Sequence, residues 1–191
     1  RILFYCPFQF SLKSKFLNQL GGIETLNIEL AKKLTKFDHE VYLSTYCNEI
    51  IKKNKIINIP INKLDHKKYN FDVIISSNNS KIFNYFKESK KFLWLHNTLA
   101  IEKSLRKGLL YPILSNNINA VFVSSYLNKI TSQFYLFKQR QVLLNFLPSV
   151  YEKNKINFKR KKIFIWSVQR EKGLHQLLDL WSEKIFINRK D

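Results

Sequence analysis

The sequence predicts an α/β protein built on a doubly wound parallel sheet of the Rossmann type. Hydrophobic residues make up 45% and charged residues 25% of the 191 residues, which is ordinary globular composition with enough apolar side chains for a core. Short, continuous apolar runs recur along the chain and suit strands buried on both faces of a parallel sheet. Segments with apolar residues at helical spacing separate these runs, and this alternation is typical of an open α/β sheet.

The first 46 residues read as a β–loop–α–β unit. Residues 2–8, "ILFYCPF", form an apolar run that predicts the first strand. Residues 40–46, "EVYLSTY", predict the second strand. Between them the apolar positions that follow a helical period, and so predict a helix, are Ile23, Leu26, Leu30, Leu34 and Phe37.

The alternation continues to residue 146. Further strands are expected at 56–61, 71–77, 91–97, 120–125 and 141–146. Helices are expected through 81–89, through 100–114 with an interruption at Pro112, and through 125–135. Residues 1–147 are therefore expected to form one Rossmann-like domain.

The amino-acid composition of the chain changes after residue 147. Residues 148–161 are polar and charged, and they predict an interdomain linker. Residues 162–168, "KIFIWSV", predict a new strand, followed by a helix expected to carry Leu174, Leu177, Leu178 and Trp181 on one face. Because one β–α unit cannot bury its apolar face alone, we expect 162–191 to begin a second Rossmann-like domain and the chain to be part of a longer protein.

The chain is strongly basic, with a formal net charge of +19. Of its 33 basic residues 27 are Lys, and they are scattered in short clusters rather than gathered in a basic–aromatic motif. The interpretation we favour is compositional drift. An anionic membrane surface and a nucleic acid are the alternative explanations, and we expect no nucleic acid partner.

The cysteines and histidines show no metal-binding spacing. Cys6 and Cys47 stand apart, and the four histidines are dispersed. Cys6 lies in a strand-like run and is expected to be a buried thiol. Unpaired cysteines favour a reducing compartment, so we expect a cytoplasmic protein, with peripheral contact to the inner face of a membrane as the alternative.

Three short stretches are candidate binding sites because each follows a predicted strand. Gly21 and Gly22 open the first helix, where they would form either a phosphate cradle or a turn with positive φ. His96 ends the run 91–97 and would contact a sugar or cap the strand. The third stretch combines cations with a helix start, so it would be an anion site or a solvated basic turn, and it contains Arg170, Lys172 and Gly173.

In this order the segments resemble glycosyltransferase family 4. "GGIETLNIELAKKLTKFDHEVYLSTY" is similar to the family's first loop, helix and strand, "WLHNT" to a strand whose His lies at the donor sugar, and "VFVSSYLNK" to a helix entry. "FIWSVQREKGLHQLLDLW" resembles the opening of the nucleotide-binding domain. The family's Gly-Arg pair is replaced here by Trp166 and Ser167.

The resemblance implies a GT-B fold and a retaining transfer of sugar from a nucleotide-diphosphate sugar to a glycan or lipid acceptor, without an obligatory metal or cofactor. It implies that His96 orients the donor sugar and that the backbone at Gly21 and Gly22 holds the diphosphate from one side. Arg170, Lys172 and Gly173 would hold it from the other. Weaker pocket candidates, with Glu24 favoured as a helix cap, are Glu24, Asn97 and Ser124.

The resemblance further implies that the paired glutamates of the nucleotide site lie beyond Asp191, so the chain by itself is expected to be inactive. Two alternatives stay open. The first is a non-catalytic binding domain of GT-B type, and the second is a basic α/β protein that binds nucleic acid.

Overall fold

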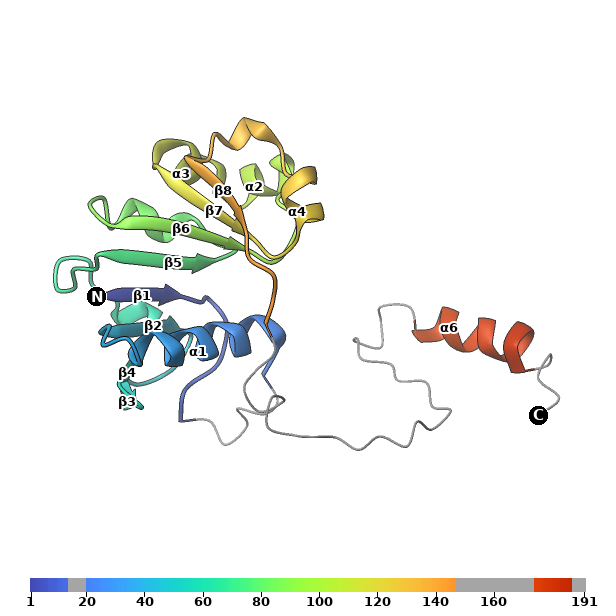
Figure 1. Ribbon diagram of the computed structural model, residues 1–191, viewed down its shortest axis with the longest axis horizontal. Helices are drawn as coiled ribbons and strands as arrows, with labels where there is room; N and C mark the ends of the chain where they lie inside the picture. Colours follow the sequence, from blue (N-terminus) through green and yellow to red (C-terminus); the bar gives the residue numbers. More distant parts are fainter. Residues whose placement is uncertain (14–19, 147–173, 187–191) are drawn as a thin grey trace. The chain divides into compact units, whose positions relative to one another are not determined.

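The computed structural model describes residues 1–13, 20–146 and 174–186. The chain divides into two compact units, Arg1–Asn154 and Lys155–Asp191, which are taken separately below. The first unit contains an eight-stranded sheet with the order β3-β4-β2-β1-β5-β6-β7-β8 (Figure 1). All neighbouring strands are parallel except β3 and β4, so the predicted α/β class with a mostly parallel sheet is confirmed.

The elements follow one another in the predicted alternation. The strands are β1 (Ile2–Tyr5), β2 (Val41–Thr45), β3 (Ile51–Lys53), β4 (Ile56–Pro60), β5 (Val73–Ser77), β6 (Lys90–Leu95), β7 (Ile118–Phe122) and β8 (Gln139–Val142). The α-helices of this unit are α1 (Gly22–Thr35), α2 (Ile101–Arg106), α3 (Leu110–Ser115) and α4 (Ser125–Ile130). Single 3₁₀ turns occur at η2 (Ile61–Lys63), η3 (Lys81–Asn84) and η4 (Gln133–Tyr135).

The parallel strands are arranged as in a Rossmann-like sheet. Starting from β1, the chain adds β2 and β4 on one side and then β5, β6, β7 and β8 on the other. The connections that leave β1 and β5 therefore run in opposite directions. In open sheets of this kind the carboxyl ends of such a strand pair form the crevice where ligands bind.

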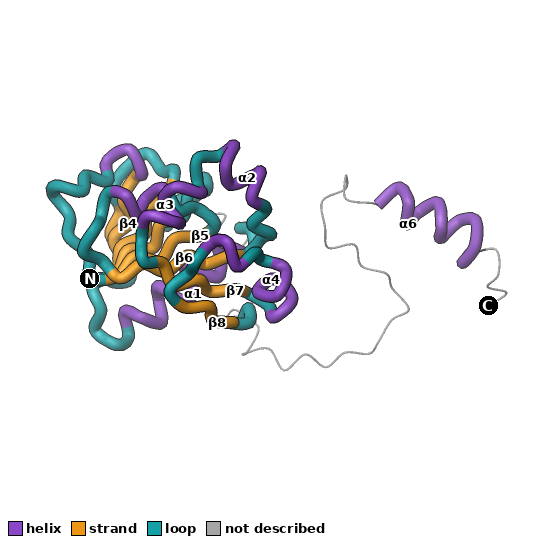
Figure 2. Tube along the Cα trace, turned by 90° about the horizontal axis from the view of Figure 1, so that it is seen from above, coloured by secondary structure: helices purple, strands orange, loops and turns teal. Residues whose placement is uncertain are grey.

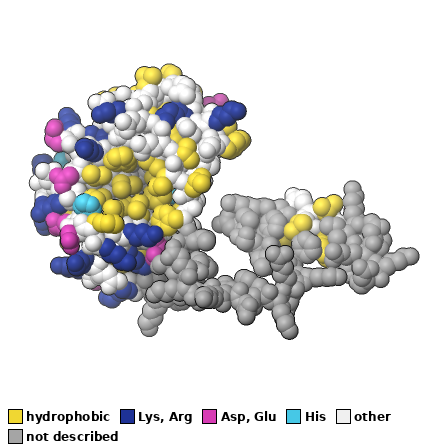
Figure 3. Space-filling model, viewed as in Figure 1, with side chains coloured by type: hydrophobic (Ala, Val, Ile, Leu, Met, Phe, Trp, Pro, Cys, Tyr) yellow, Lys and Arg dark blue, Asp and Glu magenta, His cyan; other side chains and the backbone are white. Residues whose placement is uncertain are grey.

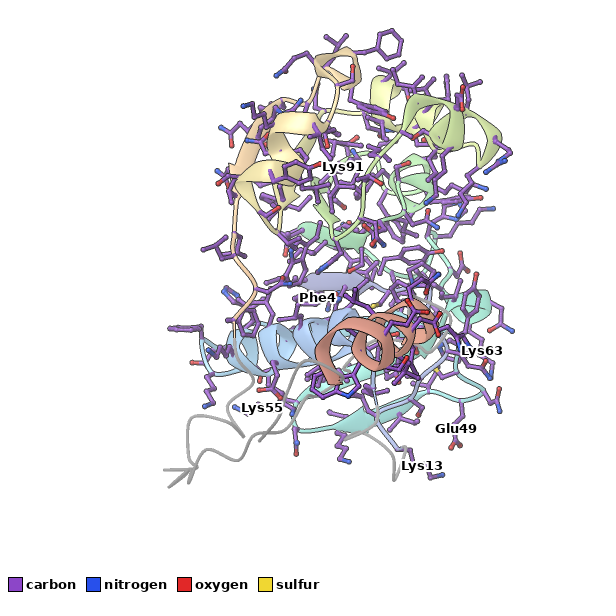
Figure 4. The ribbon with its side chains drawn as sticks, turned by 90° about the vertical axis from the view of Figure 1, so that its right-hand side faces the viewer. Phe4, Lys13, Glu49, Lys55, Lys63 and Lys91 are labelled. Atoms are coloured by element: carbon purple, nitrogen blue, oxygen red, sulfur yellow. The ribbon has the colours of Figure 1, made fainter. Side chains whose placement is uncertain are left out.

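Two apolar layers cover the sheet. Ile28 and Ala31 of α1 pack on one face against Phe4, which lies between β1 and the helix (Figure 4). On the opposite face Ile113 of α3 and Tyr135 of η4 pack against Phe122. Figure 2 shows α1 on one side of the strands and α2 and α3 on the other, which is the doubly wound arrangement.

The antiparallel edge strand β3 was not expected from the sequence. It pairs with β4 through a two-residue turn at Asn54 and Lys55, whose φ angles are 51° and 64°. Two consecutive residues with positive φ make a type I′ turn, the turn that matches the twist of a hairpin. Asn54 is the sequence signal for this turn. The lysines on either side of Asn54 make the segment polar, so the sequence does not indicate the strand.

The predicted helix over 81–89 is wrong. Only the 3₁₀ turn η3 forms. The chain then continues to β6 without a regular helix, and Phe86 is buried in the core. Because β6 already begins at Lys90, a helix reaching Ser89 would leave no residues for the turn into the strand.

The break in the segment 100–114 lies at Gly108 rather than at Pro112. Gly108 has a φ of 63°, its N–H donates to the Leu105 carbonyl at 2.9 Å, and the Leu109 N–H donates to the Ser104 carbonyl at 2.8 Å. This pair of bonds is a Schellman motif, which ends a helix on a left-handed glycine. Pro112 falls in the first turn of α3, where its missing N–H has no helical partner to lose.

Two later boundaries also differ from prediction. The helix expected over 125–135 is divided into α4 and η4, and the strand expected over 141–146 is replaced by β8, which ends at Val142. Arg140 explains the first difference, because its guanidinium donates to the Asn128 and Thr131 carbonyls, both at 2.7 Å, at the end of α4.

In the second unit the structure describes α6 (Leu174–Leu180) and the π-helix η5 (Trp181–Phe186) that continues it. The predicted helix is thus present, with Leu174, Leu177 and Trp181 half-buried and Leu178 exposed. The expected linker 148–161 and strand 162–168 lie outside the described residues. Across the described ranges, no helix combines the length and the apolar character needed to cross a membrane.

Arg140 provides a test of what holds the α4 region. Its side chain makes five hydrogen bonds and its guanidinium carbon lies 5.0 Å from the ring centre of Phe122. Lysine keeps the charge but lacks the planar fork, so Arg140→Lys should lower the free energy of unfolding by about 2 kcal/mol. Arg106→Lys on the exposed surface of α2 is the matched control, and chemical denaturation measures both. Equal stability of the two variants would contradict this role for Arg140.

Candidate functional site

A cavity of about 510 Å³ opens at the carboxyl ends of β1, β5 and β6. Pro7 and Phe8 follow β1, Ser77 and Asn78 end β5, and the segment after β6 and helix α2 complete the wall. We call it the switch-point cavity, because it lies where the connections from β1 and β5 diverge. This is the place at which open α/β sheets bind ligands.

Among the described residues that line the switch-point cavity, four are cationic and none is Asp or Glu. These residues, here called the cavity cations, are Lys81, Lys103, Arg106 and Lys107. All are exposed, and none makes an ion pair with a described residue. Elsewhere on the same unit lysines do pair, as Lys13 does with Glu49 at 2.8 Å (Figure 4). The cavity therefore presents uncompensated positive charge, which attracts anions.

The floor of the cavity is held by buried hydrogen bonds. The Ser80 hydroxyl donates to the Leu109 carbonyl at 2.7 Å and so ties the segment after β5 to the α2–α3 turn. The Ser104 hydroxyl lies 2.9 Å from the Tyr135 hydroxyl, which fixes α2 against η4. Lys81 packs beside Gly108, with its Cε 3.6 Å from the position that a Cβ of residue 108 would occupy, which is ordinary van der Waals contact.

Asn78 holds an uncommon backbone conformation in the cavity wall. Its φ is 55°, in the left-handed region that few residues other than glycine adopt. Its N–H donates to the Trp94 carbonyl at 3.0 Å, and its Oδ1 accepts the His96 N–H at 2.8 Å. Asparagine tolerates this conformation better than most side chains, and such strain collects at functional sites.

Asn78, Trp94 and His96 together form what we call the Asn78 cluster. The Trp94 and His96 rings lie 4.7 Å apart between centroids. Asn78 Nδ2, Trp94 Nε1 and His96 Nε2 are all buried, and none has a hydrogen-bond partner within the described part of the chain. Buried polar atoms are nearly always paired, so three unpaired atoms in one cluster point to groups reserved for another molecule.

Burial sets the protonation state of His96. It lowers the pKa of this imidazole from its ordinary value of 6.5 to about 4, because the charged form is poorly solvated in the protein. His96 is therefore neutral at neutral pH, with one ring nitrogen as donor and the other as acceptor. It does not line the cavity itself, but Leu95 and Asn97 on either side of it do.

The two glycines that open α1 lie outside the lining of the switch-point cavity. Gly21 is the N-cap with a φ of −64°, and among the described glycines only Gly108 has a positive φ. The explanation of this pair as a left-handed turn is therefore wrong. The Glu24 carboxylate lies over Gly21, with Oε2 2.5 Å from the position of the missing Cβ. An acidic group there interacts favourably with the partial positive charge of the helix N-terminus.

Of the remaining predicted site residues, some line the cavity and others do not. Asn97 lines the switch-point cavity. Ser124 is the N-cap of α4, where its Oγ accepts the Leu127 N–H at 3.1 Å, and it does not line the cavity. The second anion stretch lies outside the described residues, and it comprises Arg170, Lys172 and Gly173.

Sequence reasoning missed Asn78 and the cavity cations. Asn78 directly follows the run 71–77, so its place at the carboxyl edge was a usable signal. Lys103, Arg106 and Lys107 recur at spacings of three and four, which puts them on one face of a helix. What the sequence does not indicate is that Lys81 comes to the same place from another connection.

Cys6 is buried as predicted and takes no part in the site. Burial raises the pKa of its thiol well above the ordinary range, so the reactive thiolate is suppressed. Within the described ranges, no group of three or more His, Cys, Asp and Glu side chains is placed to hold a metal ion.

The fold and the cavity together define an α/β protein with a Rossmann-like sheet and a cationic switch-point site. A comparison with models of known protein families finds no match. A comparison with curated proteins finds no similar sequence.

The pKa of His96 predicts how stability depends on pH. The unfolded chain binds a proton at His96 below about 6.5 while the folded chain does not until about 4, so stability should fall as the pH is lowered through this interval. His96→Asn should flatten that part of the profile, as followed by thermal unfolding. His39→Asn, at an exposed histidine, is the control and should keep the wild-type slope. A His96→Asn profile as steep as that of the wild type would contradict the assignment.

Proposed function

We propose that the protein acts in glycosyl transfer, moving a sugar from a nucleotide-diphosphate sugar to a glycan or lipid acceptor with retention of configuration. One observation carries the proposal. At the carboxyl ends of β1, β5 and β6, a cavity with four cations adjoins a cluster whose buried polar atoms lack partners. The order of motifs that resembles glycosyltransferase family 4 supports it, and the GT-B arrangement is part of the proposal.

The chemistry requires negative charge to be stabilised as the diphosphate leaves the anomeric carbon. Preorganised N–H donors and cations supply such stabilisation without an obligatory metal. The proposal assigns to the diphosphate the backbone at Gly21 and Gly22, together with Arg170, Lys172 and Gly173, which lie outside the described residues. Because the Glu24 carboxylate lies over Gly21, a diphosphate binding there must displace this flexible side chain.

His96 is proposed to orient the donor sugar. As a neutral imidazole it offers a hydrogen bond without placing a second charge beside the diphosphate. Its backbone N–H is held by Asn78, so the ring is positioned by the two strand ends that flank the crevice. Asn97, which lines the cavity, is proposed to contact the acceptor.

Contact with an anionic membrane surface is proposed on the side of α2 and η4. Leu105, which directly precedes Arg106 in α2, is 62% exposed, and Leu136 at the end of η4 is 79% exposed. Basic residues beside exposed apolar side chains favour the headgroup region of anionic lipids. On the face in Figure 3 the remaining Lys and Arg side chains are spread around the body, which fits compositional drift better than a nucleic-acid surface.

The test is an assay of the protein as it is encoded against a panel of nucleotide-diphosphate sugars. We expect release of a nucleoside diphosphate that depends on an acceptor, and a product whose anomeric configuration, read by NMR, matches the donor. His96→Asn should lower the turnover roughly 10- to 100-fold while nucleotide affinity is kept. His39→Asn is the matched control. A wild-type rate for His96→Asn would remove His96 from the site, and no donor consumption at all would refute the transferase.

The diphosphate contact is tested separately by calorimetry with nucleoside diphosphates. Lys172→Ala removes one charge-assisted contact and should weaken the affinity about tenfold. Lys36→Ala, an exposed lysine at the end of α1, serves as the charge-matched control. Unchanged affinity in Lys172→Ala would show that this lysine does not hold the diphosphate.

A further inference from the structure

We infer that the switch-point cavity binds a phosphate group carried by the acceptor, so that the sugar is transferred to a phosphorylated molecule. That the ligand is the acceptor rests on the proposed function. That the ligand carries a phosphate rests on the cavity alone. We thus infer a second anion site, separate from the donor diphosphate contacts expected at Gly21, Gly22 and Lys172.

The first argument is charge. Lys103, Arg106 and Lys107 crowd one face of the short helix α2, and Lys81 reaches the same cavity from the segment after β5. Like charges at helical spacing repel one another. Among the described residues of the lining there is no acidic side chain to offset them. A bound anion removes the conflict.

The second argument is the kind of anion. Lysine provides point charges and arginine a planar fork, and together they suit the several oxygens of a phosphate. The wall adds neutral polar side chains for a hydroxylated body, including Asn97 and Thr98. Phe8 and Leu99 line the cavity and provide an apolar surface against which a sugar face can pack. A volume of about 510 Å³ lies within the usual range of small-molecule sites.

The third argument separates this site from the donor. The residues that line the cavity run from Pro7 to Leu109, so they all belong to the first unit. Gly21 and Gly22 are not among them, and Glu24 places a negative charge at the start of α1. All the described lining residues are therefore in the first unit, and the 191-residue chain contains them, so it can be used for the test.

The experiment measures binding to this chain by calorimetry, with glucose 6-phosphate, glucose and inorganic phosphate as probes. Glucose 6-phosphate should bind at least about tenfold more tightly than glucose, because the phosphate adds charge-assisted hydrogen bonds. Lys103→Gln/Arg106→Gln should weaken it roughly 10- to 100-fold. Lys81→Gln/Lys107→Gln repeats the test with the other two cations. All of these side chains are exposed, so unfolding midpoints should stay close to wild type.

The control removes the same amount of charge far from the cavity. Lys52→Gln/Lys55→Asn lies on the β3–β4 hairpin at the other edge of the sheet, and asparagine suits the positive φ of residue 55. This variant should bind glucose 6-phosphate like the wild type. Equal weakening in the control and cavity variants would mean attraction by net charge only and would overturn the site. Equal affinity for glucose and glucose 6-phosphate would overturn it as well.

Two further arms distinguish a soluble phosphate from a lipid headgroup. Phosphatidylcholine vesicles with phosphatidic acid should compete with glucose 6-phosphate if the headgroup is the source, and vesicles of phosphatidylcholine alone should not. A lack of competition assigns a soluble phosphorylated acceptor. In the active protein, equal use of neutral and phosphorylated acceptors would overturn the inference and leave the transferase standing. Phosphate binding without consumption of any nucleotide sugar would instead refute the proposed function and the acceptor role, and leave the phosphate site standing.

Discussion

The parallel pairing of β1 with β2 on one side and β5 on the other is the constraint on which the rest of the molecule depends. Leu3 and Phe4 on this strand have no exposed surface, since each points into one of the two apolar layers. Because β1 has a neighbour on each side, later strands are added on both sides of it, and the connections that leave β1 and β5 run in opposite directions. The buried Asn27 side chain of α1 then donates to Ser77 at the end of β5, at 2.9 Å, and connects the two halves where they diverge.

A left-handed residue and a group of unpaired buried atoms occur together where the connections diverge. Asn78 takes a left-handed conformation, and the Asn78 cluster holds three of the four buried side-chain atoms that lack a partner among the described residues. Strained backbone and unpaired polar atoms each cost free energy, and folding alone gives no reason to keep them together. Proteins retain such conflicts mainly at functional sites. The cluster and the cavity beside it therefore identify the same edge of the sheet by independent physical signs.

Much of the fold was predictable because strands buried on both faces have continuous apolar sequences. The runs around Phe4, Leu43 and Ile74 are apolar without alternation, and each became a central strand. The errors came from tertiary requirements: the early start of β6 prevents a helix up to Ser89, and Arg140 ends α4. For the site, the sequence located His96 and Asn97 at a strand end. It could not bring Lys81 to α2, because that approach depends on how two connections distant in the sequence fold back together.

The cavity cations and the groups that position them are physically separate. The cations are exposed and contribute little to stability, whereas α2 is held by the buried contact between Ser104 and Tyr135 and by the Ser80 hydroxyl on Leu109. The number and arrangement of charges at the rim are therefore free to change without unfolding the support beneath them. If the cavity binds an anion as we propose, the rim is the part of the site where its identity could change most easily. The Asn78 cluster, built into two strand ends, is fixed by the sheet itself.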